Sequence, residues 1–284
     1  NSFGQFGIGT TQSSNLPVKV AENVTDFAAG GHHSLYIDSS GNLFSSGMNT
    51  YGQLGNGIDS YPNRSTTFSK VAESVISVSA GTSFTIFVKS DNSLHVMGSN
   101  LAGQLGMGFG VEKRHHPTKI SVNAQNVMSV AAGQNHSLFL KTDKTMWGMG
   151  YNEGGQISDG SFNNRETAVQ VLVEEGVPMT GVIKICADRS SLFLKDDSTA
   201  WGMGFNESGQ LGNGVTDNRS FAVKISDDVK DIATGGNFNL ILRSDGTLWG
   251  VGSNQSGQLG LGNLGELNSL TKIADNVESI AANS

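Results

Sequence analysis

One pentapeptide recurs six times along this chain, and its spacing is the feature that most restricts the fold. The copies read NSFGQ, NTYGQ, NLAGQ, NEGGQ, NESGQ and NQSGQ, and they end at Gln5, Gln53, Gln104, Gln156, Gln210 and Gln258. The steps between these glutamines are 48, 51, 52, 54 and 48 residues. A period of about 50 residues is typical of propellers and solenoids, in which each repeat is one supersecondary unit.

Each period contains four short runs with strand character and no helical pattern. In the third period these runs are PTKISV from Pro117, VMSVAA from Val127, SLFLKT from Ser137 and TMWGMG from Thr145. Turn sequences such as AAGQNH and KTDK separate them. Four antiparallel strands in a unit of this length describe a propeller blade, which must stack on its neighbours to bury both of its faces. We therefore predict an all-β propeller, one domain over residues 1–284, with repeat steps near Asn49, Asn100, Asn152, Asn206 and Asn254.

Counted in this order, the strands make five complete blades and a C-terminal half blade. The last segment, LTKIADNVESIAANS from Leu270, supplies two strands of a sixth unit. The other two strands of that unit belong before Asn1, because the pentapeptide normally follows the fourth strand. We expect a fragment that lacks upstream strands, and a ring of six or seven blades in the full-length protein.

The glycines of the fullest copy, NESGQLGNG from Asn206 to Gly214, raise the alternative of a nucleotide site. A phosphate-binding loop is a single glycine-rich turn that leads from a parallel strand into a helix, whose amides hold the anion. Here no helix follows and the motif occurs six times. We therefore predict that Gly209, Gly212 and Gly214 adopt positive φ or lie beneath a neighbouring strand.

Composition limits the classes of function. The hydrophobic fraction is 37% and the charged fraction 15%, which suits a globular chain with a continuous core. A net charge of −7 argues against binding to a phosphate backbone, so we expect no nucleic-acid partner. No run approaches the ~18 apolar residues of a membrane span, and we expect no membrane insertion. Neither a cytoplasmic nor a secreted location is favoured.

The sequence contains no motif of a catalytic or cofactor site. Gly-x-Ser-x-Gly, His-Glu-x-x-His and Walker sequences are all absent. The adjacent His115 and His116 raise a zinc alternative, but no third ligand with familiar spacing lies beside them. We interpret His33 and His136 as residues that brace turns through bonds to the backbone, and Cys186 as a buried, inert thiol. We expect no catalytic residue, metal or cofactor.

The chain resembles the regulator of chromosome condensation repeat family over essentially its whole length. The family signature, two small residues followed by Gly-x-x-His-Ser-Leu, is intact in FAAGGHHSLYI from Phe27 and VAAGQNHSLFL from Val130. The aromatic residue of the Gly-x-Gly strand end is present as Trp147, Trp201 and Trp249. Some copies depart from the signature, with Phe84, Ser190 and Phe238 in place of histidine, and Ala187 in place of glycine.

This resemblance implies a β-propeller, and a family whose members are exchange factors for small GTPases, scaffolds or, in one bacterial branch, β-lactamase inhibitors. Our leading hypothesis is a monomeric, non-enzymatic module that binds a protein partner. An exchange factor is the second hypothesis, although it needs a wedge or loop and no insertion stands out. An inhibitor of a secreted enzyme is the third, with Tyr51, Tyr61 and Phe162 as its exposed aromatic candidates.

An up-and-down blade divides its connections between two faces. One face collects acidic turns such as SDD from Ser226 and ADN from Ala274, and we expect this face to be acidic. The other carries the pentapeptide loops, where an arginine recurs about ten residues past the glutamine. Each arginine could clamp its own loop by binding carbonyl groups, or it could contact a partner. We predict that the partner-binding face contains Arg64, Lys113, Arg114, His115, Phe162, Arg165 and Arg219.

Overall fold

The computed structural model describes residues 1–59, 63–108 and 110–282, and within these ranges every regular element is a β-strand. Five four-stranded antiparallel sheets follow one another along the chain. The first three consist of β1 (Val24–Ala29), β2 (His33–Asp38), β3 (Leu43–Met48) and β4 (Arg64–Ala72); β5 (Val75–Ala80), β6 (Phe84–Lys89), β7 (Leu94–Ser99) and β8 (Lys113–Lys119); and β9 (Val127–Ala132), β10 (His136–Lys141), β11 (Met146–Gly150) and β12 (Arg165–Gln170). The last two consist of β15 (Val182–Ala187), β16 (Ser190–Lys195), β17 (Ala200–Gly204) and β18 (Arg219–Ser226); and β19 (Val229–Gly235), β20 (Phe238–Arg243), β21 (Leu248–Ser253) and β22 (Glu266–Ala274).

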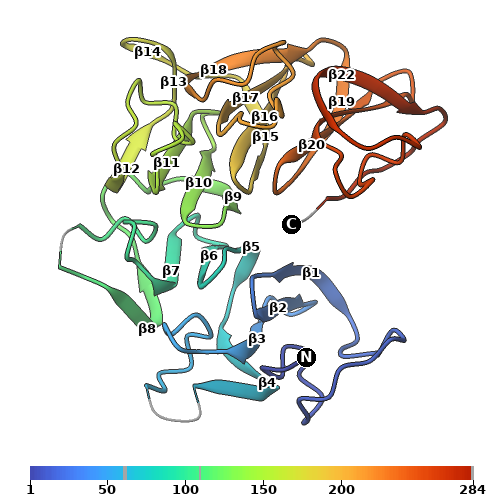
Figure 1. The fold of residues 1–284 in the computed structure, drawn as a ribbon. Coiled ribbons are helices and arrows are strands. Elements are labelled where there is room, and N and C mark those ends of the chain that lie inside the picture. Colours follow the sequence, from blue (N-terminus) through green and yellow to red (C-terminus); the bar gives the residue numbers. More distant parts are fainter. Residues whose placement is uncertain (60–62, 109, 283–284) are drawn as a thin grey trace.

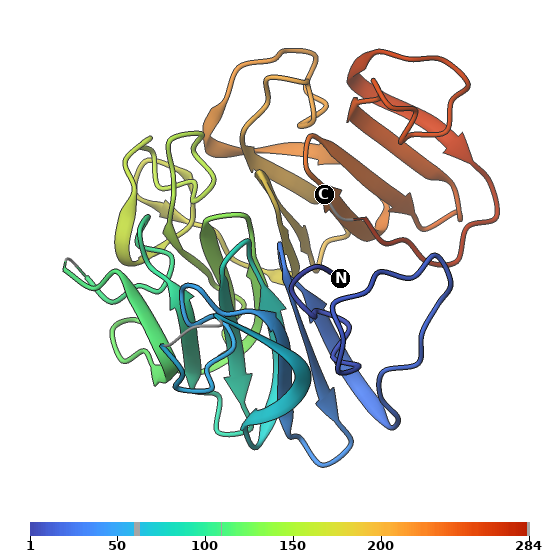
Figure 2. The same cartoon turned by 60° about the horizontal axis from the view of Figure 1, so that its bottom comes forward.

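The sheets are the blades of a propeller and are arranged along an arc (Figure 1). The first strand of each blade lies nearest the axis, and these inner strands pack in the order β1, β5, β9, β15 and β19. Figure 2 shows the same blades from another side, with both chain ends near the first and fifth blades. The predicted all-β propeller of four-stranded blades is confirmed. Within the described part of the chain, no helix is long and apolar enough to cross a membrane.

The hydrogen bonds group the strands one position later than the sequence order suggested. The run VMSVAA (β9) opens the third blade, and β12, from the next sequence period, completes it. The last five pentapeptides therefore lie inside blades, between the third and fourth strands, and the first precedes β1. The run LTKIA, expected to open a sixth blade, belongs to β22 and completes the fifth, because it pairs with β21. No strand is assigned in residues 275–282.

Large apolar side chains fill the space between neighbouring blades. Leu138 and Leu140 of blade three pack with Phe193 of blade four. Leu192 and Leu194 pack in the same way against Val229, Ile232 and Ile241 of blade five. The predicted packing between blades is confirmed for these four leucines. In blade five Leu242 is buried and Leu240 is half-buried, and packing between blades stays a prediction for this pair.

The pentapeptide loops are structural corners in all six copies. The asparagine side chain accepts a hydrogen bond from the backbone N–H five residues later, as Asn152 does from Ile157 at 2.8 Å. The glutamine accepts one from the backbone N–H two residues earlier, as Gln156 does from Gly154. Gly155 has a φ of +85°, and a Cβ there would lie 2.3 Å from the Arg219 carbonyl of the next blade. The structural interpretation of the glycines is confirmed.

The structure contains an insertion between blades three and four, where no insertion was predicted. A two-stranded hairpin, β13 (Leu172–Glu174) and β14 (Val177–Pro178), lies between β12 and β15. Its base is anchored by Met179, which is 1% exposed, and its tip is exposed. Strands of two and three residues are too short to show an alternating pattern, so no strand was predicted there.

The face opposite the pentapeptide loops carries the predicted acidic residues but is not simply acidic. Aspartates of the short turns are used internally: Asp197 accepts from the Thr199 hydroxyl, which itself accepts from the Trp201 indole N–H at 2.8 Å. The same relay recurs in blades three and five. Lysines at the ends of the fourth strands pair with other acids, as in Lys70–Glu73, Lys224–Asp227 and Lys272–Asp275. The expectation of an acidic face is therefore corrected to one of mixed charge.

Candidate protein-binding face

Two sets of connections form the candidate protein-binding face, here named the pentapeptide face. They are the loops between the third and fourth strands and the short turns between the first and second strands. The turns of blades two to five are tied together around the axis. The Thr82 N–H donates to the Gln134 carbonyl, and the Gln134 N–H donates to the Asp188 carbonyl. The Asp188 carboxylate then accepts from the Gly236 N–H at 3.0 Å.

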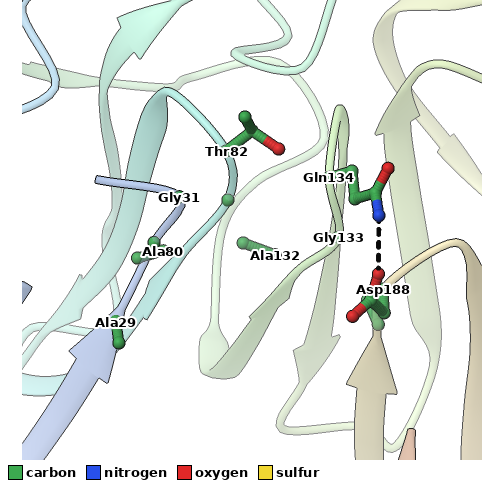
Figure 3. Close-up of a pocket in the computed structure, with 11 residues that line it drawn as sticks. Ala29, Gly31, Ala80, Thr82, Ala132, Gly133, Gln134 and Asp188 are labelled. Atoms are coloured by element: carbon green, nitrogen blue, oxygen red, sulfur yellow. Dashed lines mark hydrogen bonds between the residues drawn. The ribbon is translucent and has the colours of Figure 1, made fainter. Parts of the chain in front are cut away.

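A small cavity of about 150 Å³ lies at the mouth formed by these turns (Figure 3). Its wall is made of the small residues that end the inner strands, including Ala29, Ala80 and Ala132. Its polar side chains are Thr82, Gln134 and Asp188, and the Gln134 amide donates to the Asp188 carboxylate at 3.1 Å. The mouth thus offers few side chains that are not already bonded to one another.

The prediction that Ala187 stands at the signature glycine position of blade four is wrong. Ala187 had been aligned with the signature glycine, but it pairs with Ser191 as Ala132 pairs with Ser137, so it ends the inner strand. Asp188 occupies the glycine position, and this turn is one residue shorter than that of blade three. A side chain fits there because Ser190 replaces the histidine ring that otherwise fills the space. The sequence does contain an indication of this difference, because the charged residues Asp188 and Arg189 stand where the other copies have glycine and an uncharged residue.

The signature histidines link one blade to the next. The His33 ring bonds through Nε2 to the Thr85 hydroxyl of blade two at 3.0 Å, and His136 bonds to Ser191 of blade four at 2.8 Å. The expectation of a bond to the backbone was wrong, because the packing of blades brings a hydroxyl within reach. These hydroxyls donate onward to the carbonyls of the pentapeptide glutamines. Since both hydroxyls donate elsewhere, each imidazole donates its Nε2–H.

Burial lowers the pKa of both His33 and His136 to about 4. Both rings are therefore neutral at pH 7, and both are 1% exposed, so neither can exchange protons with a substrate. The signature glycine is explained by the same packing. A Cβ at Gly30 or Gly133 would lie 2.2 Å from the imidazole of its own turn.

The recurring arginines do not form one cluster. Arg114, Arg165 and Arg219 each lie opposite the last glycine of a Gly-x-Gly strand end, whereas Arg64 lies one position earlier, opposite Met48. They occupy the outer strands of four separate blades. Arg165 clamps its own loop, because its guanidinium binds the Asp159 carboxylate and donates to the Ser161 hydroxyl.

The remaining arginines differ in their surroundings. Arg114 donates to the Lys113 carbonyl at 3.2 Å, a local bond of the same clamping kind. Arg219 is half-buried and Arg64 is exposed. The loop-clamp interpretation therefore has its best support at Arg165.

The other predicted contact residues also lie toward the outside of the blades. Lys113 pairs with Asp59 at 3.1 Å, and His115 Nε2 lies 3.4 Å from the same carboxylate. Phe162 is 48% exposed in the loop that Arg165 clamps. Tyr61, a candidate of the inhibitor hypothesis, lies outside the described residues. Among those that are described, no group of three or more His, Cys, Asp or Glu side chains could hold a metal ion.

Cys186 is a free thiol whose burial raises its pKa to about 11. Its Sγ lies 3.4 Å from the Ile232 carbonyl, to which the thiol donates across the interface between blades four and five. This environment does not favour the reactive thiolate form.

Four apolar residues nearer the axis were not recognised together as a site. They come from the loops of blades one to four and are Tyr51, Leu101, Tyr151 and Phe205. Tyr51 lies two residues after its loop asparagine and Leu101 one residue after it, whereas Tyr151 and Phe205 each lie one residue before it. Leu101 is 65% exposed, and the Tyr151 and Phe205 rings stack with centroids 6.3 Å apart. The sequence did not predict this group, because its members stand at different positions in their loops. The packing of the blades brings them to one surface.

A scan against protein families matches the model of the RCC1-like domain to residues 1–284. The chain belongs to this family. It is 31% identical to the ultraviolet-B receptor UVR8 of Arabidopsis thaliana, over 78% of this chain and 51% of that protein. It is 30% identical to the secretion-regulating guanine nucleotide exchange factor of Mus musculus, over 74% of this chain and 48% of that protein. The chain thus spans about half the length of these curated relatives.

Solved structures agree on the fold. Human WBSCR16 superposes with a TM-score of 0.78 at 21% identity, covering 90% of this chain and 69% of that one. Prp20p of Saccharomyces cerevisiae superposes with a TM-score of 0.68 at 16% identity, covering 92% and 80% respectively. At such identities the likeness supports the fold alone.

Proposed function

We propose that this chain is a non-enzymatic module that binds a protein partner through its pentapeptide face. The observation that carries the proposal is a contrast within each loop. The asparagine, glutamine and glycine residues recur and are mostly buried. The residue after the asparagine is accessible and has four identities in five blades: Thr50, Leu101, Glu153, Glu207 and Gln255. Variable side chains on a rigid scaffold are the usual basis of specific binding.

The structural relatives support a protein as the partner class. Prp20p is described with its binding to Gsp1p and histones, and a second structure holds yeast RCC1 bound to Kap60. For this chain, Tyr51, Leu101, Tyr151 and Phe205 would form the apolar centre of the interface. The exposed residues Arg64 and Phe162, with the half-buried Lys113, would contribute to its rim, as in interfaces with an apolar core and a polar border.

Substitutions on the two faces test this proposal with a purified partner, obtained by affinity capture from the source and then reconstituted. Leu101→Asp and Tyr151→Asp should each weaken binding at least about tenfold in calorimetry, since central apolar contacts carry most interface energy. Val122→Asp is the matched control, because Val122 is 57% exposed on the opposite face. If only the Val122→Asp variant loses affinity for the partner, the interface lies on the opposite face and the proposal is wrong.

Exchange of nucleotide on a small GTPase is the second candidate function. It is favoured by family membership together with the 30% identity to a guanine nucleotide exchange factor. Release of fluorescent GDP from a panel of purified small GTPases would test it. Faster GDP release at substoichiometric concentrations of the chain would establish this activity. Unchanged GDP release across the panel would exclude nucleotide exchange as a function for the GTPases tested.

A further inference from the structure

Two adjoining concavities on the pentapeptide face are lined by loops of blades one to four, and together they are here named the groove. One concavity of about 380 Å³ lies between Tyr51 and Tyr151, with Leu101 in its wall. A second, of about 190 Å³, lies between Tyr151 and Phe205. Tyr151 and Asn135 line both concavities, so the two are neighbours that share these residues as a common wall.

The groove changes in chemical character along its length. Its first part has an apolar wall, made by the exposed Leu101 with Ala102 and Tyr51, and a polar wall that includes Ser83, Asn135 and Asn164. Its second part is lined by Tyr151, Phe205 and the charged pair Asp188 and Arg189. Two exposed carboxylates, Glu153 and Glu207, lie outside this lining, and each follows the asparagine of its loop. The Tyr151 hydroxyl donates to the Glu153 carboxylate at 3.0 Å, which fixes that charge at the edge of the ring.

Both carboxylates act on the same aromatic side chain. The pKa of Tyr151 is raised, first by burial, then by its hydrogen bond to Glu153 and the charge of that residue, and to a smaller extent by the charge of Glu207. Arg189 opposes these effects. The middle of the groove therefore lies within the field of two negative charges and one positive charge.

The positive charge is already engaged by the protein. Arg189 donates to the Asn237 side-chain oxygen at 2.9 Å, and its guanidinium carbon lies 4.9 Å from the centroid of the Phe205 ring. The neighbouring Asp188 carboxylate accepts from Gln134 and Gly236, and the residue is 6% exposed. Because Asn237 and Phe205 are neutral, Arg189 keeps its charge, but the two exposed glutamates outnumber it around Tyr151 and leave a net negative charge whose complement is a cation.

We propose that this groove binds an extended segment of the partner protein, which places a bulky apolar side chain against Leu101 and a lysine or arginine against Tyr151, between Glu153 and Glu207. The inference rests on the proposed function and specifies its partner. The ring face of Tyr151 adds a cation–π attraction. Amide side chains of Asn135 and Asn164 line the groove and can bond to the backbone of an extended chain. The net charge of −7 also favours association with a basic segment.

A positional-scanning library of random decapeptides, in which one residue is fixed at a time, provides the probe for the full chain. We expect selection of lysine or arginine at one position and of a bulky apolar residue a few positions away. The Glu153→Gln/Glu207→Gln variant should lose the preference for the cation about tenfold and keep that for the apolar residue. The Leu101→Asp variant should show the reverse loss. The matched control, Glu22→Gln/Glu73→Gln on the opposite face, should select as the wild type does.

Three results would overturn the inference: no selected peptide, selection without a cation, or a cation preference that survives the double glutamine variant. If the library selects only the apolar residue and Leu101→Asp abolishes that selection, the cation site fails while binding through the pentapeptide face stands. The proposed function fails separately if a purified protein partner binds the Leu101→Asp and Tyr151→Asp variants with wild-type affinity.

Discussion

The two faces of the propeller are built from the same number of repeats but are stabilised in different ways. On the pentapeptide face, loop shape depends on glycines at positive φ and on buried asparagine and glutamine side chains that bond to the backbone. On the opposite face, exposed aspartate side chains bond to half-buried threonine side chains, which bond to half-buried tryptophans in a repeated relay. The first arrangement leaves the remaining loop positions open to variation, whereas the second uses the side chains that a partner would contact. A partner-specific surface is therefore better accommodated by the pentapeptide face.

The largest effect that would test this contrast comes from a pair of glycines. Gly155→Ala should cost about 2 to 5 kcal/mol, because positive φ strains alanine and the new methyl would meet the Arg219 carbonyl at 2.3 Å. Gly246, in a turn of the opposite face, also has positive φ, but a Cβ there would lie 3.9 Å from its nearest neighbour. Gly246→Ala should therefore cost only about 1 to 2 kcal/mol, from backbone strain. Equal losses in urea unfolding would contradict the difference between the faces.

The signature histidines should make the pentapeptide face sensitive to acid. Their pKa of about 4 in the folded chain lies below the ordinary 6.5, so the unfolded chain binds more protons between these values. Stability should fall as the pH is lowered from about 6.5 to about 4, by about 3 kcal/mol per histidine.

The His33→Phe/His136→Phe variant should lose most of this pH dependence, since phenylalanine already occupies the position in blades two and five. Urea unfolding at pH 7.5 and pH 4.5 provides the measurement, with the exposed His116→Phe as control. An unchanged pH dependence in the double variant would exclude the buried histidines as its source.

Arg165 distinguishes a loop clamp from a partner contact. Arg165→Ala leaves the Asp159 carboxylate, whose side chain is 5% exposed, without its ion pair, and should cost about 2 kcal/mol. The exposed Arg64→Ala should change stability by less than about 0.5 kcal/mol. Thermal unfolding and partner affinity should be measured on both variants. Loss of affinity at full stability in Arg165→Ala would instead assign it to the interface.

The smallest expected effect belongs to the relay of the opposite face. Hydrogen bonds from Thr199 hold the pKa of Asp197 below its usual range, so its contribution to stability is present at neutral pH and lost as the pH falls below about 3.8. Asp197→Ala should cost about 0.5 to 1 kcal/mol at pH 7 and alter the fluorescence of Trp201. Glu207→Ala, an exposed residue of the pentapeptide face, should leave stability unchanged. Similar changes in the free energy of unfolding for the two variants would contradict a structural role for Asp197.

The sequence by itself determined the repeat, the four strands per period and the structural nature of the glycine loops. These are local properties: a strand follows from alternating apolar residues, and a tight loop follows from glycines at fixed offsets. The same local information located the core leucines Leu138 and Leu194, because alternate positions of a strand share a face.

Only the tertiary structure decided which strands share a blade, where Asp188 lies and which residues line the groove. Sequence order is compatible with either grouping of the strands, since a strand is assigned to a blade by its hydrogen-bonded neighbour. The histidine of one blade finds its hydroxyl partner about 50 residues later, in the next blade. Leu101, Tyr151 and Phe205 likewise share a surface because the ring brings successive loops together. These contacts depend on the packing of neighbouring blades, which residue patterns within one repeat do not specify.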